Sequence, residues 1–398
     1  MPGAYLKGWY SAACFGACLK RARRVRGKVR KKTRLLLGVG ALLLVAAACA
    51  PNATQSALDP QGPYARTSYD LFVPVFWVAA TIFFLVEGAL LLFAIKYRHR
   101  KGRDKIPPQV HGNTRLEIAW TILPALILAG VSVPTVTTIF DLARKPAGEV
   151  MNVHVLGHQW WWEFDYPDQK IITANELHIP TGVPVYLTLC AVGSGYQQGI
   201  GAPSDCQPGP PDGQSPAAVG DAVLHSFWVP QLAGTQDVVP GRANTLLIQA
   251  DHPGTYTGQC KEFCGLSHAY MKFTVVAHTP DDFAAWVLGQ QADAAAPASG
   301  SLAATGMNEF VNGGCIACHA IQGVEAPNGG PLLANGGPNL THFASRSCFA
   351  GCMMPTNEEN LKKWLDNPPA VKAGSWMPDY GLTPQQIDAL AAYLLTLK

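Results

Sequence analysis

The decisive stretch is CKEFCGLSHAYM, residues 260–271, in which two thiols, an imidazole and a thioether share one short loop. His225 supplies a second imidazole from upstream. This soft ligand set suits copper. A disulfide between Cys260 and Cys264, or a single blue-copper ion, leaves the second cysteine beside His268 and Met271 unexplained. The pattern therefore predicts two copper ions bridged by two thiolates.

Short β-rich runs surround this loop. From Glu149 onward apolar and polar residues alternate, and the runs PVYLTL, NTLLIQA and MKFTVVAH follow, punctuated by Gly and Pro. This texture is typical of a small all-β sandwich or barrel. A Gly/Pro/Ser-rich insertion between Cys190 and Asp221 reads as a surface loop. We predict a disulfide between Cys190 and Cys206, which bracket part of it.

Two apolar segments precede the β-rich region, at Leu71–Ile95 and Leu116–Phe140. Each is long enough for a bilayer core of ~30 Å, which needs roughly 20 helical residues. The short loop between them is rich in Lys and Arg, and the positive-inside rule puts it in the cytoplasm. The sequence therefore predicts a two-helix transmembrane hairpin, with everything after Asp141 facing outward.

The N-terminus has the pattern of a targeting segment. A basic run, Lys20–Arg34, precedes the apolar stretch Leu35–Ala48, which is typical of a secretory signal. The basic run alone would also fit nucleic-acid binding, but the net charge of the 398-residue chain is only +3. Cys49 follows small residues as in a lipoprotein cleavage box, and a signal cleaved after Ala or left uncleaved is the alternative.

A second cofactor motif lies near the C-terminus. Cys315-Ile-Ala-Cys318-His319 is the spacing at which two thiols bind two vinyl groups of one porphyrin and the next residue presents an imidazole to the iron. A structural zinc site would need a second pair of ligands at matching spacing. Cys348 and Cys352 form the one candidate pair, and the helical context and export signal favour haem c.

The sixth iron ligand should lie downstream. Met377, in Gly-Ser-Trp-Met-Pro, is the first candidate, because a thioether opposite His raises the reduction potential. Met353 and Met354 compete but lie closer to the haem-binding helix. Two helices are predicted around this loop. ENLKKWLDN has Asn357 as its N-cap, and TPQQIDALAAYLLTLK has a capping box that begins at Thr383.

Residues 303–398 resemble small class I cytochromes c. In that family the axial Met lies in such a Met-Pro loop, which favours Met377. The resemblance also implies that the carbonyl of Pro338 accepts a hydrogen bond from His319 and orients it. Cys348 and Cys352 depart from the family pattern, and we interpret them as a local disulfide, with two free buried thiols as the alternative.

The segment from Phe72 to Thr279 resembles cytochrome c oxidase subunit II, a helical hairpin followed by a cupredoxin-like domain. The resemblance rests on WTILP, GHQWWWE, His225-Ser226, Pro-Gly-Arg242 and the C-x-E-x-C-x3-H-x2-M loop. It implies that Cys260 and Cys264 bridge a dicopper CuA centre and that His225 and His268 each ligate one copper. It further implies that Met271 is a weak ligand and that Glu262 contributes its carbonyl, with its carboxylate at a Mg²⁺ site shared with subunit I.

The family also assigns roles outside the copper loop. By position, Trp160 is the residue at which electrons arrive above the copper, with core packing as the alternative. In a strand, Trp160 and Trp162 would face away from Trp161, so that one face of this cluster is core. Glu117, at the start of the second apolar segment, matches a glutamate at the entrance of the proton pathway into subunit I.

These resemblances imply an electron-transfer subunit of a haem–copper oxidase in the bacterial plasma membrane, with its copper and haem domains outside. Electrons would run from cytochrome c or a cytochrome bc complex through haem c and CuA to haem a of subunit I, where oxygen is reduced to water with proton pumping. Subunit III is a further expected partner, and nucleic acid is not. The alternatives are a copper-containing nitric oxide reductase, a copper carrier, and a quinol oxidase, which would lack the copper ligands.

The expected organisation is a multidomain chain in which a linker tethers haem to copper and turns a diffusional encounter into an intramolecular one. The predicted parts are a signal at 1–49, a linker at 50–69, the hairpin at 70–140, an all-β cupredoxin-like CuA domain at 141–285, a linker at 286–302, and a small all-α cytochrome c domain at 303–398.

Overall fold

The computed structural model describes residues 36–40, 53–98, 108–109, 111–193, 221–330, 332 and 336–398. The chain divides into two compact units, Met1–Thr54 and Gln55–Lys398. The basic run, Cys49 and most of the predicted signal lie outside the described residues, and so does Cys206. Cys190 is part of a disulfide.

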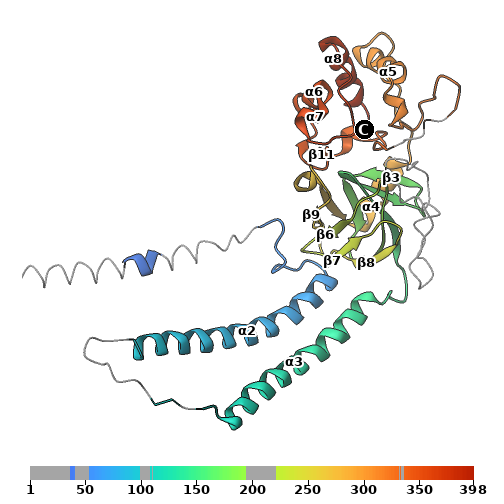
Figure 1. Ribbon diagram of the computed structural model, residues 1–398. Helices are drawn as coiled ribbons and strands as arrows, with labels where there is room; N and C mark the ends of the chain where they lie inside the picture. Colours follow the sequence, from blue (N-terminus) through green and yellow to red (C-terminus); the bar gives the residue numbers. More distant parts are fainter. Residues whose placement is uncertain are drawn as a thin grey trace, which may run out of the picture. The chain divides into compact units, whose positions relative to one another are not determined.

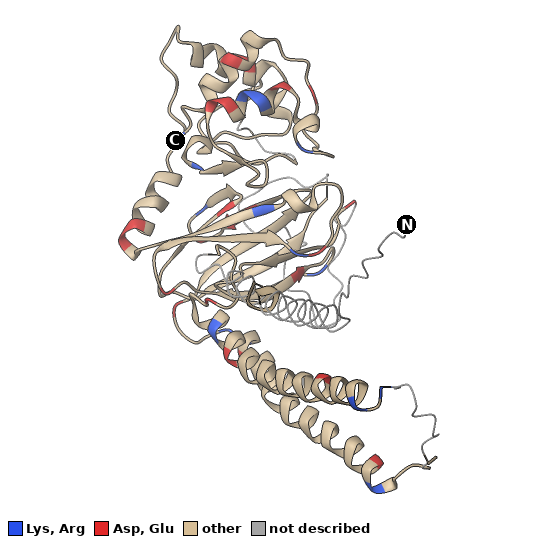
Figure 2. Ribbon diagram, turned by 90° about the vertical axis from the view of Figure 1, so that its left-hand side faces the viewer, with Lys and Arg blue, Asp and Glu red and all other residues tan. Residues whose placement is uncertain are grey.

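The helical hairpin consists of α2, Pro63–Lys96, and α3, Thr114–Ala143 (Figure 1). Both are long and apolar enough to cross a membrane, and Figure 2 shows them as largely tan, with most charged residues toward their ends. Helix α2 begins at Pro63, inside the predicted linker 50–69. Proline at the first helical position is already in helical geometry, and Arg66 of this first turn pairs with Asp251 of the β-domain at 2.8 Å.

The β-domain is a sandwich of two five-stranded sheets, ordered β3-β2-β1-β5-β8 and β4-β10-β9-β6-β7 (Figure 1). Strand β1 runs parallel to β5, and β10 parallel to β4, while the other pairs are antiparallel. The predicted all-β domain is confirmed, with three of its strands in the three quoted runs. The strands are β1 Met151–His158, β2 Trp161–Tyr166, β3 Ile171–Ala174, β4 Glu176–Pro180, β5 Val185–Ala191, β6 His225–Trp228, β7 Thr235–Val238, β8 Asn244–Ile248, β9 Gly254–Cys260 and β10 Lys272–His278.

An aromatic cluster fills the space between the two sheets. Trp162, Phe164, Phe227 and Phe273 are fully buried, and their rings meet at centroid separations between 4.3 and 6.4 Å. Such pairs add to the free energy gained from burial alone, by ~0.5–1.5 kcal/mol each. Strand β6, which begins at His225, and strand β9, which ends at Cys260, are therefore anchored in a well-packed core.

Helix α4, Pro280–Gln290, follows the last strand and corrects the predicted linker boundary at 286. Thr279 caps the helix by accepting a hydrogen bond from the amide of Asp282, and Phe283 and Trp286 pack against the sandwich core. Because these aromatic side chains are anchored, the first residues of the predicted linker are helical and belong to the β-domain.

The C-terminal domain is built on the crossing of α5 and α8. A Cβ at Gly306 of α5 would collide with the backbone of Ala389 and approach Tyr393, so glycine permits this close contact. Phe310 packs edge-on against Tyr393 beside the crossing. The predicted Asn357 cap and the capping box at Thr383 are both confirmed. The elements are α5 Leu302–Asn312, η3 Cys315–Ala317, η4 Phe343–Ser345, β11 Cys348–Phe349, β12 Met354–Pro355, α6 Glu358–Asp366, α7 Pro368–Val371 and α8 Pro384–Leu394.

Candidate copper and haem sites

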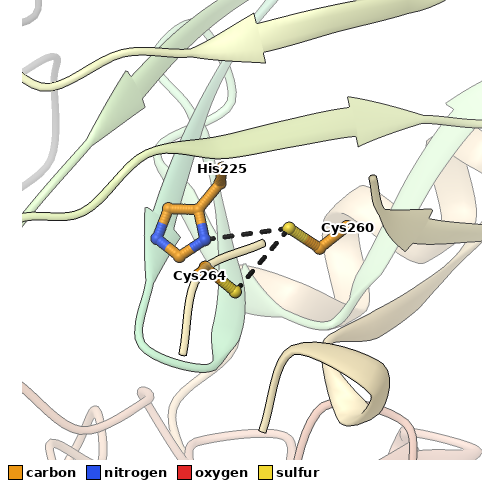
Figure 3. Close-up of side chains that lie close together, drawn as sticks. All are labelled: His225, Cys260 and Cys264. Atoms are coloured by element: carbon orange, nitrogen blue, oxygen red, sulfur yellow. Dashed lines mark hydrogen bonds between the residues drawn. The ribbon is translucent and has the colours of Figure 1, made fainter. Parts of the chain in front are cut away.

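The copper loop brings its two thiols to one buried point. Sγ of Cys260 lies 3.8 Å from Sγ of Cys264 and 3.9 Å from Nδ1 of His225 (Figure 3). Both cysteines are free, and all three residues are buried. A disulfide requires sulfurs ~2.05 Å apart, so the cysteines are placed as separate ligands.

Of the remaining predicted ligands, His268 and Met271 approach Cys264, and the Glu262 carbonyl approaches Cys260. Sγ of Cys264 is 3.6 Å from Nδ1 of His268 and 3.8 Å from Sδ of Met271. The carbonyl oxygen of Glu262 lies 3.2 Å from Sγ of Cys260. Two thiols thus stand between two imidazoles, a thioether and a carbonyl, which is a donor set that fits two copper ions.

Neighbouring strands hold this loop at both ends. The amide of Cys260 donates to the carbonyl of Met271 at 2.9 Å, which ties the first ligand to the last. In the middle, the carbonyl of Cys264 accepts from the Gln159 side chain at 2.7 Å and from Nε1 of Trp160 at 2.9 Å. Gly265 has φ +115°, a conformation that favours glycine. The backbone and not only the ligands therefore determines where the thiols point.

The two thiols titrate as an unequal pair. Hydrogen bonding to Cys264 lowers the pKa of Cys260, although burial acts in the opposite direction. The same hydrogen bond, together with burial, raises the pKa of Cys264. The pair therefore holds one thiolate readily, and binding of a second metal must displace a proton.

The haem motif lines a cavity of about 310 Å³ in the C-terminal domain. This volume falls within the ~300–1,000 Å³ of typical ligand pockets. Its wall is mostly apolar, with Phe310, Leu340, Phe343, Leu361, Leu365 and Leu390 among its members. Cys315, Cys318 and His319 open onto the same space. A large apolar cavity beside two free thiols and an imidazole fits a covalently attached haem.

The orientation of His319 also suits an iron ligand. Its Nδ1 lies 2.8 Å from the carbonyl oxygen of Pro338, so that Nδ1 carries the proton and Nε2 keeps its lone pair. Burial lowers the pKa of His319, although the bond to Pro338 opposes this effect. The imidazole is therefore neutral, as metal binding requires.

Met377 lies in the wall of this cavity. Its sulfur accepts a hydrogen bond from Nε1 of Trp364 at 3.1 Å. Met354 is buried in the domain core instead, and Met353 packs against that core. Cys348 and Cys352 form a disulfide, as predicted. This bond removes the second ligand pair that a zinc site would have needed.

The three tryptophans are arranged differently from a simple strand alternation. Trp160 lies in the turn before β2, and only Trp161 and Trp162 are in the strand. All three are buried, because Trp161 stacks on His158 with centroids 4.0 Å apart and Trp160 is covered by the C-terminal domain. Trp160 and Trp161 also line the haem cavity.

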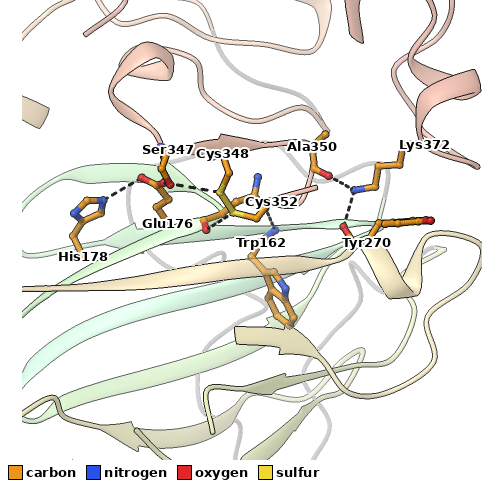
Figure 4. Close-up of a disulfide and its surroundings, with 10 residues drawn as sticks. Trp162, Glu176, His178, Tyr270, Ser347, Cys348, Ala350, Cys352 and Lys372 are labelled. Atoms are coloured by element: carbon orange, nitrogen blue, oxygen red, sulfur yellow. Dashed lines mark hydrogen bonds and ion pairs between the residues drawn. A yellow bond between two sulfur atoms is a disulfide. The ribbon is translucent and has the colours of Figure 1, made fainter. Parts of the chain in front are cut away.

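Two buried polar residues lie where the C-terminal domain contacts the β-domain, and they were not expected from the sequence. Lys372 has only 4% of its surface exposed, and its ammonium faces carbonyl groups of both domains (Figure 4). Glu176 of the β-domain accepts hydrogen bonds from the amide and hydroxyl of Ser347. Burial lowers the pKa of Lys372 to about 7, although the nearby Cys264 opposes this effect. No local pattern marks this contact, since Trp160, Tyr270 and Ser347 are distant in the sequence from the residues they bind.

The two remaining predicted residues are exposed. Glu117 lies in the first turn of α3, where its carboxylate accepts from the amide of Asn113 at 3.2 Å. This contact stabilises the start of the helix. Glu262, within the copper loop, is exposed.

Family models match three parts of the chain. Cytochrome C oxidase subunit II, transmembrane domain, matches residues 52–138, the periplasmic domain of the same subunit matches 217–278, and cytochrome c matches 303–398. These matches imply CuA and haem c as the cofactors and make the chain a membrane protein. The geometry of both sites fits those groups.

Individual relatives agree with these matches. Cytochrome c oxidase subunit 2 of Alkalihalophilus pseudofirmus is 36% identical over 93% of this chain and 99% of its own length. Quinol oxidase subunit 2 of Bacillus cereus is 33% identical over 58% of this chain and 71% of its own. The periplasmic domain of cytochrome oxidase subunit II of Bradyrhizobium japonicum covers 37% of this chain and 96% of its own, with 22% identity and a TM-score of 0.28. With 36% identity over nearly all of both chains, the protein belongs to the cytochrome c oxidase subunit 2 family.

Proposed function

We propose that this chain carries electrons into a haem–copper oxidase, from a donor through haem c and CuA to haem a of subunit I, which reduces oxygen to water and pumps protons. When bound, the two groups accept and release single electrons. The chain itself offers two ligand sets in one extracytoplasmic part, and this supports a relay rather than copper storage. The oxygen chemistry belongs to subunit I.

Trp160 carries the proposal. Its indole lines the haem cavity, and Nε1 of the same ring donates to the carbonyl of Cys264 at 2.9 Å. One side chain thus touches both candidate sites. We propose it as the residue through which electrons reach the copper.

Individual ligand roles follow from the contacts. We propose Cys260 and Cys264 as the bridging thiolates, His225 and His268 as one ligand to each copper, Met271 as a weak ligand and Glu262 as a carbonyl ligand. For haem c we propose attachment to Cys315 and Cys318, with His319, oriented by Pro338, and Met377 on the iron. The cavity wall holds Met377 but neither Met353 nor Met354, which supports this choice.

Three further roles rest on family position. We propose Glu117 at the start of the proton pathway into subunit I, and the exposed Glu262 carboxylate as a ligand to Mg²⁺ at the boundary with that subunit. Cytochrome c or a cytochrome bc complex would be the donor, and subunit III a second partner. The setting would be the bacterial plasma membrane.

The test is optical absorption and copper EPR on the purified oxidase that contains this chain. A haem c α-band together with a mixed-valence dicopper signal is expected. A chain that binds haem but shows no dicopper signal after copper loading would reduce the protein to a membrane-tethered cytochrome. Anaerobic reduction with reduced cytochrome c then identifies the donor, because a donor must reduce haem c before CuA.

A further inference from the structure

A buried lysine joins the cytochrome domain to the β-domain. Nζ of Lys372 donates to the carbonyl oxygen of Trp160 at 2.6 Å. It also donates to those of Ala350 at 2.8 Å and Tyr270 at 3.3 Å, the two contacts drawn in Figure 4. An ammonium has three N–H donors and no acceptor, so its hydrogen-bonding capacity is filled. Two of the three carbonyls belong to the β-domain and one to the cytochrome domain.

Burial of this group makes the contact specific. A buried ammonium is costly unless it is hydrogen-bonded, and a bond from a charged donor is roughly twice as strong as a neutral one. If the domains separate, Lys372 loses two of its three acceptors. The seated arrangement is therefore the one in which this side chain is satisfied within the protein.

The disulfide-closed loop Cys348–Cys352 is the second part of the contact. Ala350, Gly351 and Cys352 all have positive φ, which turns the loop tip toward the β-domain. There the carbonyl of Gly351 accepts from the amide of Lys272 at 3.0 Å. A Cβ on Gly351 would collide with the carbonyl of Tyr270. The tip therefore fits against the strand that follows the copper loop.

Two more hydrogen bonds lie on either side. The hydroxyl of Ser267, in the copper loop, donates to the carbonyl of Ala373 at 2.6 Å. The amide of Ser347 donates to the Glu176 carboxylate at 2.7 Å. Between them the Trp160 ring faces Gly374, where a Cβ would come within 2.5 Å of the indole. Trp160 is consequently only 6% exposed.

We infer that Lys372 and the Cys348–Cys352 loop hold the cytochrome domain permanently seated on Trp160, as a resident donor rather than a tethered domain that docks for each transfer. Lys372 lines the haem cavity, but its Nζ donates only to backbone carbonyls, so it is a positioning residue. A soluble donor must deliver electrons to the haem domain, since the Trp160 surface is occupied. This inference rests on the proposed function and adds how electrons pass from haem c to copper, within a domain contact that does not open between transfers.

The first readout is hydrogen exchange on the complete oxidase. The amide of Lys272 reports the seated state, because its acceptor is Gly351 of the other domain. Lys372→Met should accelerate exchange there on the order of tenfold, the effect of losing a hydrogen-bonded charged group. Lys363→Met makes the same charge change at an exposed position of α6 and should leave exchange unaltered. Unchanged protection of Lys272 in Lys372→Met would overturn the role of Lys372.

The second readout is the rate of electron transfer from haem c to copper after photoreduction. In the unmodified oxidase this rate should not depend on solvent viscosity, whereas in Lys372→Met it should be slower and fall as viscosity rises. A viscosity-dependent rate in the unmodified oxidase would overturn the inference. It would leave the proposed function intact, because that function fails only if the haem or dicopper spectrum is missing.

Ser267→Ala provides a second variant should Lys372→Met fail to fold. It removes one hydrogen bond to Ala373 and leaves the buried lysine in place. A smaller acceleration of exchange at Lys272, roughly threefold, is expected from a single neutral hydrogen bond. Exchange identical to that of the unmodified protein in both variants would show that these contacts do not hold the domain.

Discussion

The copper loop and the haem cavity prepare for their cofactors in opposite ways. In the loop, each thiol already lies within 4 Å of another ligand, and strands β6, β9 and β10 fix the ligand backbone. In the cytochrome domain, His319 and Met377 surround an apolar space of about 310 Å³. A small metal centre can be organised by ligands in mutual contact, whereas a porphyrin must replace part of a core. The haem domain should therefore depend on its cofactor for stability far more than the β-domain does.

The largest effect is expected from Cys260→Ser. A hydroxyl is a much harder ligand than a thiolate, and this residue is one of the two proposed bridges, so the mixed-valence dicopper EPR signal should disappear completely. The haem α-band should remain. Phe263→Ala is the control, because this neighbouring side chain offers no ligand atom and is 75% exposed, with its ring centroid 5.8 Å from that of His268. A dicopper signal that survives in Cys260→Ser would refute the bridging role.

Removal of the haem should lower the stability of the cytochrome domain and leave that of the β-domain unchanged. In a Cys315→Ser/Cys318→Ser chain, helix α8 should lose its protection from hydrogen exchange while β10 keeps it. The expected loss is at least about 4 kcal/mol, the stabilisation that a ligand gives at ~1,000 times its Kd. Equal protection of α8 with and without haem would contradict the comparison drawn above.

Met377 should set the potential of the haem. Met377→Leu keeps much of the volume but removes the thioether, so the reduction potential should fall by at least ~60 mV, a tenfold change for one electron. Potentiometric titration of the α-band measures it. Met354→Leu is the matched control, since Met354 lies in the core and not in the cavity wall. If the potential falls in the control and not in Met377→Leu, the sixth ligand is misassigned.

The smallest expected effect is on the folding stability at low pH. Burial raises the pKa of Glu176, but hydrogen bonds from His178 and Ser347 outweigh it and leave the pKa below 4.5. Its contribution to stability is therefore present above that pH and is lost as the pH falls through the lowered pKa. Burial, and then His178, lower the pKa of His278 below 6.5. The unfolded chain therefore binds this proton at a higher pH than the folded chain does, and the folded state loses stability as the pH falls.

Both shifts therefore lower the thermal unfolding midpoint as the pH drops from about 7 to about 4. Glu176→Gln should cost about 1 kcal/mol at neutral pH and flatten the acid end of this profile. Glu359→Gln, at an exposed position of α6, should leave the profile as it is. A profile unchanged by Glu176→Gln would show that this carboxylate does not contribute to the acid sensitivity.

Local patterns in the sequence predicted the parts of the molecule that are built locally. The residues that decide a local structure lie close together in the sequence in three cases: the loop of residues 260–271, the capping box at Thr383 and the strand runs. The missed features join distant segments: Lys372 reaches a carbonyl 212 positions away in the sequence. Helix α4 was assigned partly to a linker because the anchoring of Phe283 and Trp286 depends on a core built elsewhere. Contacts of this kind have no periodicity from which they could be read.

The crossing at Gly306 bears on how the chain matures. Helix α5 can reach its close contact only when Ala389 and Tyr393 of α8 are available, and these follow it in the chain. The loop between the two helices must close first, at an entropic cost that grows with its length. The haem-attachment cysteines leave the ribosome before α8 exists, because synthesis proceeds from the N-terminus. We therefore expect a stage at which both thiols are accessible in a chain that has not yet folded around them.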